Sequence, residues 1–212
     1  MSDRLDPATR SRACRTLRRR DPVLAAVIRW AGPCALRPSG NPYAALLQSI
    51  IYQQLAGAAA SAIERRFLAG FGGRTPKPAQ LLAARDAALR KAGLSRQKIA
   101  ALRAVAQAFE DGTLNGRRLY RMPDEAVVEA VTQVRGIGEW TAHMLLMFSL
   151  GRPDVLPVGD YGVRKSAMQL YALEALPKRA ELEALAEPWR PYRSVAAWYL
   201  WRVVDTKTPG PA

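Results

Sequence analysis

Asp160, in the stretch DVLPVGDYGVRK, is the acidic residue of this sequence best placed to do chemistry. It stands where a helix is expected to begin, and capping that helix would by itself explain an isolated Asp there. The positive end of a helix also favours negative charge on the carboxylate, which suits it to stabilise a developing cation. Tyr161 follows directly, and Trp140, Trp198 and Trp201 supply flat surfaces that serve either a core or a pocket. Asp160 is therefore the candidate for an electrostatic role.

A turn with two glycines precedes this region, in QVRGIGEWTA at residues 133–142. An ordinary connection between two helices would account for it. The same turn, made by Gly136, Ile137 and Gly138, would also leave N–H groups at a helix N-terminus, where they can bind one phosphate without reading a base. Val134 and Ile137 would bury the apolar side of the turn, while the glycines let a DNA backbone approach.

The charge of the chain favours an anionic partner. Lys and Arg number 32 against 18 Asp and Glu, so the net charge is +14. Arginine supplies most of this charge, and its planar fork fits phosphate oxygens. Solubility alone would explain an arginine excess equally well, so the charge allows nucleic-acid binding without requiring it.

Several classes of site are excluded by what the sequence lacks. Cys14 and Cys34 are too few for a disulfide framework, a four-thiolate zinc site or an iron–sulfur cluster. His143 is the only histidine, which excludes a Ser-His-Asp triad unless another residue substitutes. There is neither a membrane-length apolar run nor a signal peptide, so we expect a soluble cytoplasmic protein without a membrane partner.

Helix signals recur along the chain and alternating strand patterns are nearly absent, which predicts an all-α fold. Asp21-Pro22 and Asn41-Pro42 pair a capping side chain with a proline in the first turn, and Ser95 caps a long helix. The expected helices cover about residues 22–32, 43–56, 58–68, 78–93 as a pair, 96–112, 124–133, 139–150, 160–173 and 192–206. Such short helices predict a compact bundle with two lobes.

The ends of the chain are expected to lie outside this bundle. Residues 1–20 contain RSRACRTLRRR and are predicted to form a solvated, disordered basic arm, with phosphate contact as the alternative. The helical domain is expected over 21–206, followed by a tail at 207–212.

Together, these segments resemble a known family. VRGIGEWTAHMLLMFSLGRPDVLPVGDYGVRK, with IYQQLAG before it and WRPYRSVAAWYLWR after it, is similar to the helix-hairpin-helix DNA glycosylase superfamily and, within it, to the DNA-3-methyladenine glycosylase II branch. The resemblance spans about residues 22–206. It implies a two-lobed helical bundle with a helix-hairpin-helix motif, whose cleft receives a base flipped out of duplex DNA.

The resemblance also implies roles for particular residues. It makes Asp160 the catalytic carboxylate and places four side chains around the flipped base: Trp140, Met144, Tyr161 and Trp201. It puts Leu55 where the family inserts an apolar wedge into the vacated stack, with Gln53 and Gln54 near the opposing strand. Gly136, Ile137 and Gly138 would contact a phosphate.

Cofactor and partner expectations follow from the same resemblance. No cofactor is required, although family hairpins hold a monovalent or divalent cation through backbone carbonyls, here those of Thr132, Val134 and Ile137. The partner is double-stranded DNA with alkylated bases, and the protein is expected to be a monomeric, DNA-associated protein of a bacterium. The relatives that also cut the strand carry a lysine where this chain has Trp140, so a monofunctional enzyme is expected.

A single carboxylate can suffice for this reaction. Breaking the bond between base and deoxyribose passes through an oxocarbenium-like state, and an alkylated purine such as 3-methyladenine already carries the positive charge that makes it leave readily. 7-Methylguanine, hypoxanthine and ethenoadenine are further candidate substrates. The competing interpretation is a non-catalytic DNA-binding protein with the same motif, against which the carboxylate of Asp160 argues.

Overall fold

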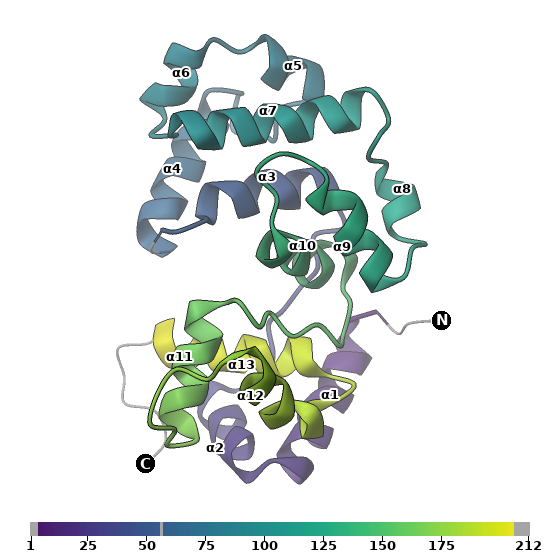
Figure 1. Cartoon of the computed structure of the whole chain (residues 1–212), viewed down its shortest axis with the longest axis vertical. Coiled ribbons are helices and arrows are strands. Elements are labelled where there is room, and N and C mark those ends of the chain that lie inside the picture. Colours follow the sequence, from purple (N-terminus) through teal and green to yellow (C-terminus); the bar gives the residue numbers. More distant parts are fainter. Residues whose placement is uncertain (1–3, 56, 206–212) are drawn as a thin grey trace. The chain divides into compact units, whose positions relative to one another are not determined.

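The computed structural model describes residues 4–55 and 57–205 of the 212-residue chain. Over these residues the chain forms helices joined by turns and contains no strand (Figure 1), which confirms the predicted all-α class. It divides into two compact units, residues 1–38 with 146–212, and residues 39–145. Within the described part, no helix is long and apolar enough to cross a membrane.

The first unit joins the two ends of the chain around α13 (Arg193–Asp205). This helix packs against α11 (Tyr161–Leu170), α2 (Pro22–Ala31) and α1 (Pro7–Arg20). The remaining elements are a π-helical turn, α12 and a 3₁₀ turn, over Leu146–Leu150, Arg179–Leu185 and Glu187–Trp189. The start of α11 is therefore held in place by helices from both ends of the sequence.

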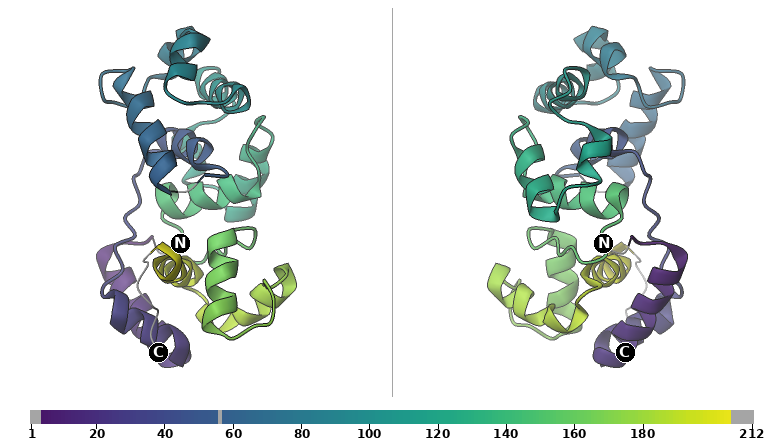
Figure 2. Two further views of the ribbon diagram at one scale, coloured as in Figure 1. Left: turned by 90° about the vertical axis from the view of Figure 1, so that its left-hand side faces the viewer. Right: turned by 90° about the vertical axis from the view of Figure 1, so that its right-hand side faces the viewer.

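The second unit is built on α3 (Pro42–Tyr52), whose apolar residues are almost fully buried. α3 packs against α4 (Gly57–Ala69), α7 (Arg96–Glu110) and α10 (Glu139–Leu145). The other helices are α5, α6, α8 and α9, over Pro78–Ala83, Asp86–Lys91, Gly116–Leu119 and Asp124–Thr132. Figure 2 shows α9 leading into α10 through a short turn, which is the predicted helix-hairpin-helix motif.

The helix starts follow the capping side chains in the sequence. Asp21 accepts the N–H of Leu24 at the start of α2, and Asn41 accepts that of Ala44 at the start of α3. Ser95 likewise caps α7. Each of these oxygens satisfies a backbone donor that lacks a partner within its helix, so the helix starts predicted at these three positions are confirmed.

The predicted disordered arm is wrong for residues 7–20, which form α1. Asp6 caps this helix, and Thr9, Ala13 and Leu17 lie four residues apart on its buried face. This buried stripe is narrow and contains only one large apolar side chain. Its apolar periodicity is therefore too weak to be recognised among the arginines of this segment. The first helix therefore precedes Asp21. The first three residues of the predicted arm and the predicted tail at 207–212 lie outside the described residues.

Candidate active site

The carboxylate of Asp160 lies at the N-terminus of α11 and is half-buried. Its Oδ1 atom accepts the backbone N–H of Val163 at 2.8 Å and the indole Nε1–H of Trp201 at 2.9 Å. Both donors, together with the helix dipole, favour negative charge on this oxygen. The predicted N-cap is thus present, and a tryptophan from α13 is attached to the same carboxylate.

The ring of Trp201, whose N–H donates to Asp160, is also held in place by Phe148. The two rings stack with their centroids 5.6 Å apart and an interplanar angle of 28°. Phe148 belongs to the π-helical turn Leu146–Leu150, where the expected single helix over 139–150 changes its winding. π-Helical turns are often found at functional sites. Trp201 was predicted as a pocket aromatic, and in the structure its polar edge is directed at Asp160.

Gly162, which was not predicted as a site residue, allows the indole of Trp201 to come close to Asp160. A Cβ atom at this position would lie 3.1 Å from Cδ1 of Trp201 and 3.2 Å from Oδ1 of Asp160. Both separations are tighter than ordinary van der Waals contacts, so a side chain would push the indole away from the carboxylate. A glycine within the first turn of a helix, two residues after a candidate catalytic Asp, is the signal that could have pointed to it.

Tyr161 is the most exposed of the predicted pocket residues. It is the first residue of α11, directly after Asp160, and is 63% exposed. The Lys165 ammonium lies 6.0 Å from the ring centroid. Since the tyrosine is not part of the core, most of its surface is available for a ligand.

The hairpin of the second unit lies between α9 and α10. Gly136 has φ of +86°, and a Cβ there would lie 2.4 Å from Cβ of Ala101 on α7. This glycine is therefore required both by the turn and by its packing on α7. Gly138 instead has open space where its side chain would be, so its backbone can be approached from outside. Ile137 is buried, as expected.

Gln53 ties the end of α3 to this hairpin. Its side-chain Nε2 donates to the carbonyl of Gly136 at 3.0 Å and to Oγ1 of Thr141 at 2.9 Å. Gln53 was predicted to lie near the opposing DNA strand. In the structure, its side-chain amide supports the hairpin.

The turn after α3 presents the predicted wedge residue. Leu55 is 39% exposed, and the preceding Gln54 is exposed with φ of +57°. Lys98 on α7 supports this turn, because its Nζ donates to the carbonyls of Ile51 at 2.6 Å and Gln53 at 3.0 Å. Partial burial lowers the pKa of the Lys98 ammonium. Lys98 was not singled out from the sequence, since a lysine in an amphipathic helix gives no sign of such a contact.

Trp140 and Met144 both lie on α10 in the second unit. Trp140 is half-buried, whereas Met144 is only 5% exposed and belongs mainly to the core of this unit. The two units thus divide the predicted residues: Asp160, Tyr161 and Trp201 lie in the first, and the hairpin, the wedge turn, Trp140 and Met144 in the second.

A cation at the hairpin would depend on backbone oxygens. Among the described residues, no group of three or more His, Cys, Asp or Glu side chains could hold a metal. The carbonyl of Val134 already accepts the N–H of Ile137 at 3.1 Å, which leaves it one lone pair for a further partner. Carbonyl oxygens suit a hard cation, so Thr132, Val134 and Ile137 stay a predicted ligand set.

Comparisons with known proteins place this geometry in a family. Residues 47–191 match the family described as HhH-GPD superfamily base excision DNA repair protein. DNA-3-methyladenine glycosylase 1 of Schizosaccharomyces pombe is 36% identical over 164 residues, which span 76% of this chain and 72% of that protein.

Two solved structures share the fold. The 3-methyladenine DNA glycosylase Mag1 of the same yeast, in complex with abasic DNA, superposes with a TM-score of 0.86 at 31% identity, over 92% of this chain and 98% of that one. A DNA-3-methyladenine glycosidase from Bacillus halodurans gives a TM-score of 0.76 at 39% identity, over 97% and 92%.

These relatives come from yeast as well as from bacteria, so the similarity does not support the bacterial source that we expected. The resemblance seen in the sequence is confirmed by the family match and by both structures. The chain belongs to the HhH-GPD superfamily of base excision DNA repair proteins.

Proposed function

We propose that this protein is a monofunctional DNA N-glycosylase that excises alkylated purines of the 3-methyladenine type from duplex DNA and leaves an abasic site. The observation that carries the proposal is the half-buried carboxylate of Asp160, fixed by the N-terminus of α11 and by the indole of Trp201. Asn or Ser would cap α11 as well as Asp does, and negative charge near phosphates opposes DNA binding, so a protein that only bound DNA would be better served by an uncharged cap.

Asp160 stabilises the sugar when the base leaves. The electron pair of the N-glycosidic bond goes to the base, and C1′ of the deoxyribose acquires positive charge. A carboxylate about 4 Å away lowers the energy of that charge by about 4 kcal/mol at an effective dielectric constant of about 20. This corresponds to roughly a thousandfold in rate.

Water completes the reaction. It adds to C1′ on the cationic sugar, and the proton that it loses passes to Asp160 or to solvent. An alkylated purine leaves as a neutral base without first being protonated, so no second carboxylic acid is required. This matches a site with one carboxylate, whose Oδ1 accepts the N–H groups of Val163 and Trp201.

The aromatic residues favour a positively charged base. The exposed ring of Tyr161 adjoins Asp160 in sequence and offers a face to an alkylated purine, worth about 0.5 to 2 kcal/mol by cation–π attraction. Trp140 stays the predicted second aromatic contact. This preference is modest, so the intrinsic lability of the damaged base supplies much of the selectivity.

The second unit supplies the contacts to the DNA backbone and to the vacated stack. The open backbone at Gly138 suits a phosphate, and the exposed Leu55 suits an apolar wedge. Lys98 and Gln53 hold the wedge turn and the hairpin in fixed geometry. Such preorganisation avoids ordering these turns at the moment of binding.

The test is single-turnover release of free base from duplex DNA that contains 3-methyladenine, in parallel with 7-methylguanine. Asp160→Asn is the informative variant, because Asn also caps helices and keeps an oxygen for both donors. Asp6→Asn, at the exposed cap of α1, is the matched control for loss of one capping charge. We expect release by the native protein and by the control, and a loss of about a thousandfold in Asp160→Asn.

Strand cleavage separates the competing activities. A monofunctional enzyme leaves the strand intact until alkali is added, and borohydride traps no covalent complex. Alkali-independent nicking with a trapped adduct would show a bifunctional enzyme. Salt-dependent DNA binding without release of any alkylated base would show a binding protein and contradict the proposal.

A further inference from the structure

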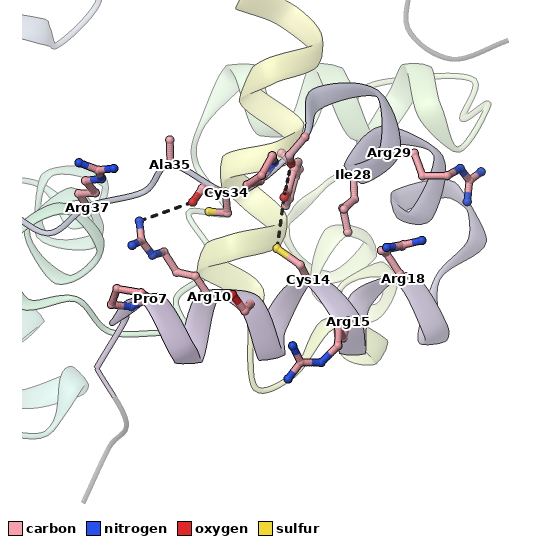
Figure 3. Close-up of a pocket in the computed structure, with 14 residues that line it drawn as sticks. Pro7, Arg10, Cys14, Arg15, Arg18, Ile28, Arg29, Cys34, Ala35 and Arg37 are labelled. Atoms are coloured by element: carbon pink, nitrogen blue, oxygen red, sulfur yellow. Dashed lines mark hydrogen bonds between the residues drawn. The ribbon is translucent and has the colours of Figure 1, made fainter.

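A basic groove lies in the first unit, separate from the residues proposed to act on the base. It is a cavity of about 660 Å³ between one face of α1, the end of α2, the loop after α2 and Tyr199 of α13 (Figure 3). The arginines that line this basic groove are Arg10, Arg15, Arg18, Arg29 and Arg37. Figure 3 shows Arg37 toward one end and Arg18 with Arg29 toward the other, so positive charge extends along its length.

The periodicity of α1 produces one wall of the groove. Arg10, Cys14 and Arg18 follow at steps of four residues, which places them on one face of the helix, and Arg15 lies at the edge of this face. From Arg10 to Arg18 the helix rises about 12 Å, and each strand of duplex DNA carries one phosphate per about 3.4 Å of axis. This wall therefore matches the length of about three phosphates.

Among the described residues, no acidic side chain lies beside these arginines in the groove. The groove has no Asp or Glu in its lining, and within the described part of the chain no ion pair forms to Arg15, Arg18, Arg29 or Arg37. Burial raises the pKa of the Cys34 thiol to about 11, so it is neutral at physiological pH. Like charges gathered in this way repel one another and attract an anion.

The groove and the catalytic carboxylate lie on different sides of α13. Tyr199 and Trp201 are two residues apart, which is about 200° around a helix. The hydroxyl of Tyr199 contacts Cys14 and donates to the carbonyl of Gly32, whereas Trp201 donates to Asp160. A ligand in the basic groove would not occupy the space beside the carboxylate.

The composition of the groove selects the kind of ligand. Five of the 14 lining residues are arginines, and four of these five are exposed to solvent, so a ligand in the groove meets positive charge. Tyr199 is the one aromatic residue in the lining and is fully buried, so no ring is available for stacking on unpaired bases. What this surface can hold is a row of phosphates, without reading their sequence.

We propose that the basic groove is a second DNA-binding site, which holds a further segment of duplex DNA by its phosphates while the Asp160 side of the unit engages the damaged base. That the anion is DNA rests on the proposed function. A site of this kind retains the protein near DNA between catalytic encounters, since a second contact raises the effective concentration of the first.

The test is titration of the native protein with a short undamaged duplex of about 12 base pairs over a range of KCl concentrations, since phosphate contacts weaken with salt. Binding is followed by fluorescence anisotropy and its stoichiometry by analytical ultracentrifugation. We expect two duplexes per native protein and one per Arg15→Gln/Arg18→Gln/Arg29→Gln variant. For the native protein, log K of the second duplex should fall with log salt with a slope of at least about 2.7 in magnitude, at about 0.9 for each of these three arginines that contacts a phosphate.

Two matched variants control for charge and for guanidinium geometry. Arg117→Gln/Arg118→Gln/Arg121→Gln removes three exposed positive charges from the second unit and should keep two duplexes. Replacing the three groove arginines by lysine keeps the charge and should restore most of the binding.

Specific outcomes would overturn the proposal. These are a single duplex bound by the native protein, or equal losses in the groove variant and the second-unit variant. A third is loss of polyglutamate binding alone in the groove variant, which would assign the groove to acidic proteins. The groove variant should release alkylated base at the native rate under saturating single-turnover conditions. Absence of release from every protein would refute the glycosylase function without bearing on the stoichiometry.

Discussion

The first unit contains two aspartates with the same local design and different surroundings. Asp21 and Asp160 each cap a helix, and each accepts an indole N–H, from Trp189 at 2.7 Å and from Trp201 at 2.9 Å. Asp21 is 6% exposed, whereas Asp160 is half-buried. The local signal for a cap is therefore the same at a position inside the core and at the candidate catalytic residue.

The carboxylates of Asp21 and Asp160 also differ in their surroundings. At Asp21, Oδ1 accepts from Leu24, while Oδ2 accepts from Trp189 and from the hydroxyl of Tyr171 at 2.6 Å. Burial, followed by contact with Asp21, raises the pKa of the Tyr171 phenol, so this donor keeps its proton well above physiological pH. At Asp160, Val163 and Trp201 both donate to Oδ1. The carboxylate of Asp21 is enclosed in the core, whereas Asp160 keeps a solvent-accessible surface that a substrate can reach.

The largest effect is expected for Asp160→Asn, on rate and not on stability. The Asn oxygen can accept from both Val163 and Trp201, so the change removes charge while keeping the cap. Single-turnover release should fall by about a thousandfold, or about 4 kcal/mol in the barrier. The free energy of unfolding, measured with urea, should fall by only about 1 kcal/mol, the part that the charge contributes at the helix N-terminus. A large loss of stability would make Asp160 a structural residue like Asp21.

The opposite result is expected for Asp21→Asn. In this variant an NH₂ group replaces one of the two oxygens, and both oxygens of Asp21 accept hydrogen bonds. In either orientation the NH₂ group therefore faces an N–H donor, from Leu24 or from Trp189, and neither of these N–H groups can accept a hydrogen bond. The unfolding free energy should fall by about 3 kcal/mol, because a buried network is broken. This lowers the Tm by about 9 °C for a chain of this length. Below that Tm, the rate of base release should match that of the native protein, and a rate loss at full folding would contradict the assignment.

Trp201→Phe should give a smaller effect at Asp160. Phenylalanine keeps a ring to stack on Phe148 but removes the N–H, and a hydrogen bond to a charged group is worth about 1.5 to 3 kcal/mol. We expect release to slow by about thirtyfold, at about 2 kcal/mol. Trp198→Phe is the control on the same helix, since Trp198 packs against Tyr199 and Arg202. Equal slowing in both variants would mean that the indole of Trp201 acts only through packing.

Features of the site that depend on neighbouring residues could be predicted from the sequence, and contacts between distant residues could not. Caps are local, so Asp21, Ser95 and Asp160 could be recognised from their neighbours. The contact of Trp201 with Asp160 joins residues 41 apart, and that of Lys98 with Gln53 joins residues 45 apart. Such contacts depend on how helices pack, which helix periodicity alone does not determine.

The same limit explains the error at α1. The sequence gives this helix a cap in Asp6 and a proline at its first position, yet its buried stripe contains only one large apolar residue. Its arginines instead form a wall of the basic groove. A charged segment with a narrow apolar stripe can therefore be a packed helix. Its net charge does not distinguish such a helix from a solvated, disordered arm.

The smallest effect is expected for Gly162→Ala, and it has opposite signs for activity and stability. The added methyl would meet Trp201 and Oδ1 of Asp160 at 3.1–3.2 Å, so the indole must shift by a few tenths of an ångström. The weakened hydrogen bond should slow release about fivefold, or about 1 kcal/mol. Alanine is the better helix former by about 0.5 to 1 kcal/mol, so urea unfolding should show a protein no less stable than the native one. Gly159→Ala, where a methyl meets nothing within 4 Å, should leave the rate unchanged. If both alanines slow release equally, the backbone before α11 matters and the distance between Trp201 and Asp160 does not.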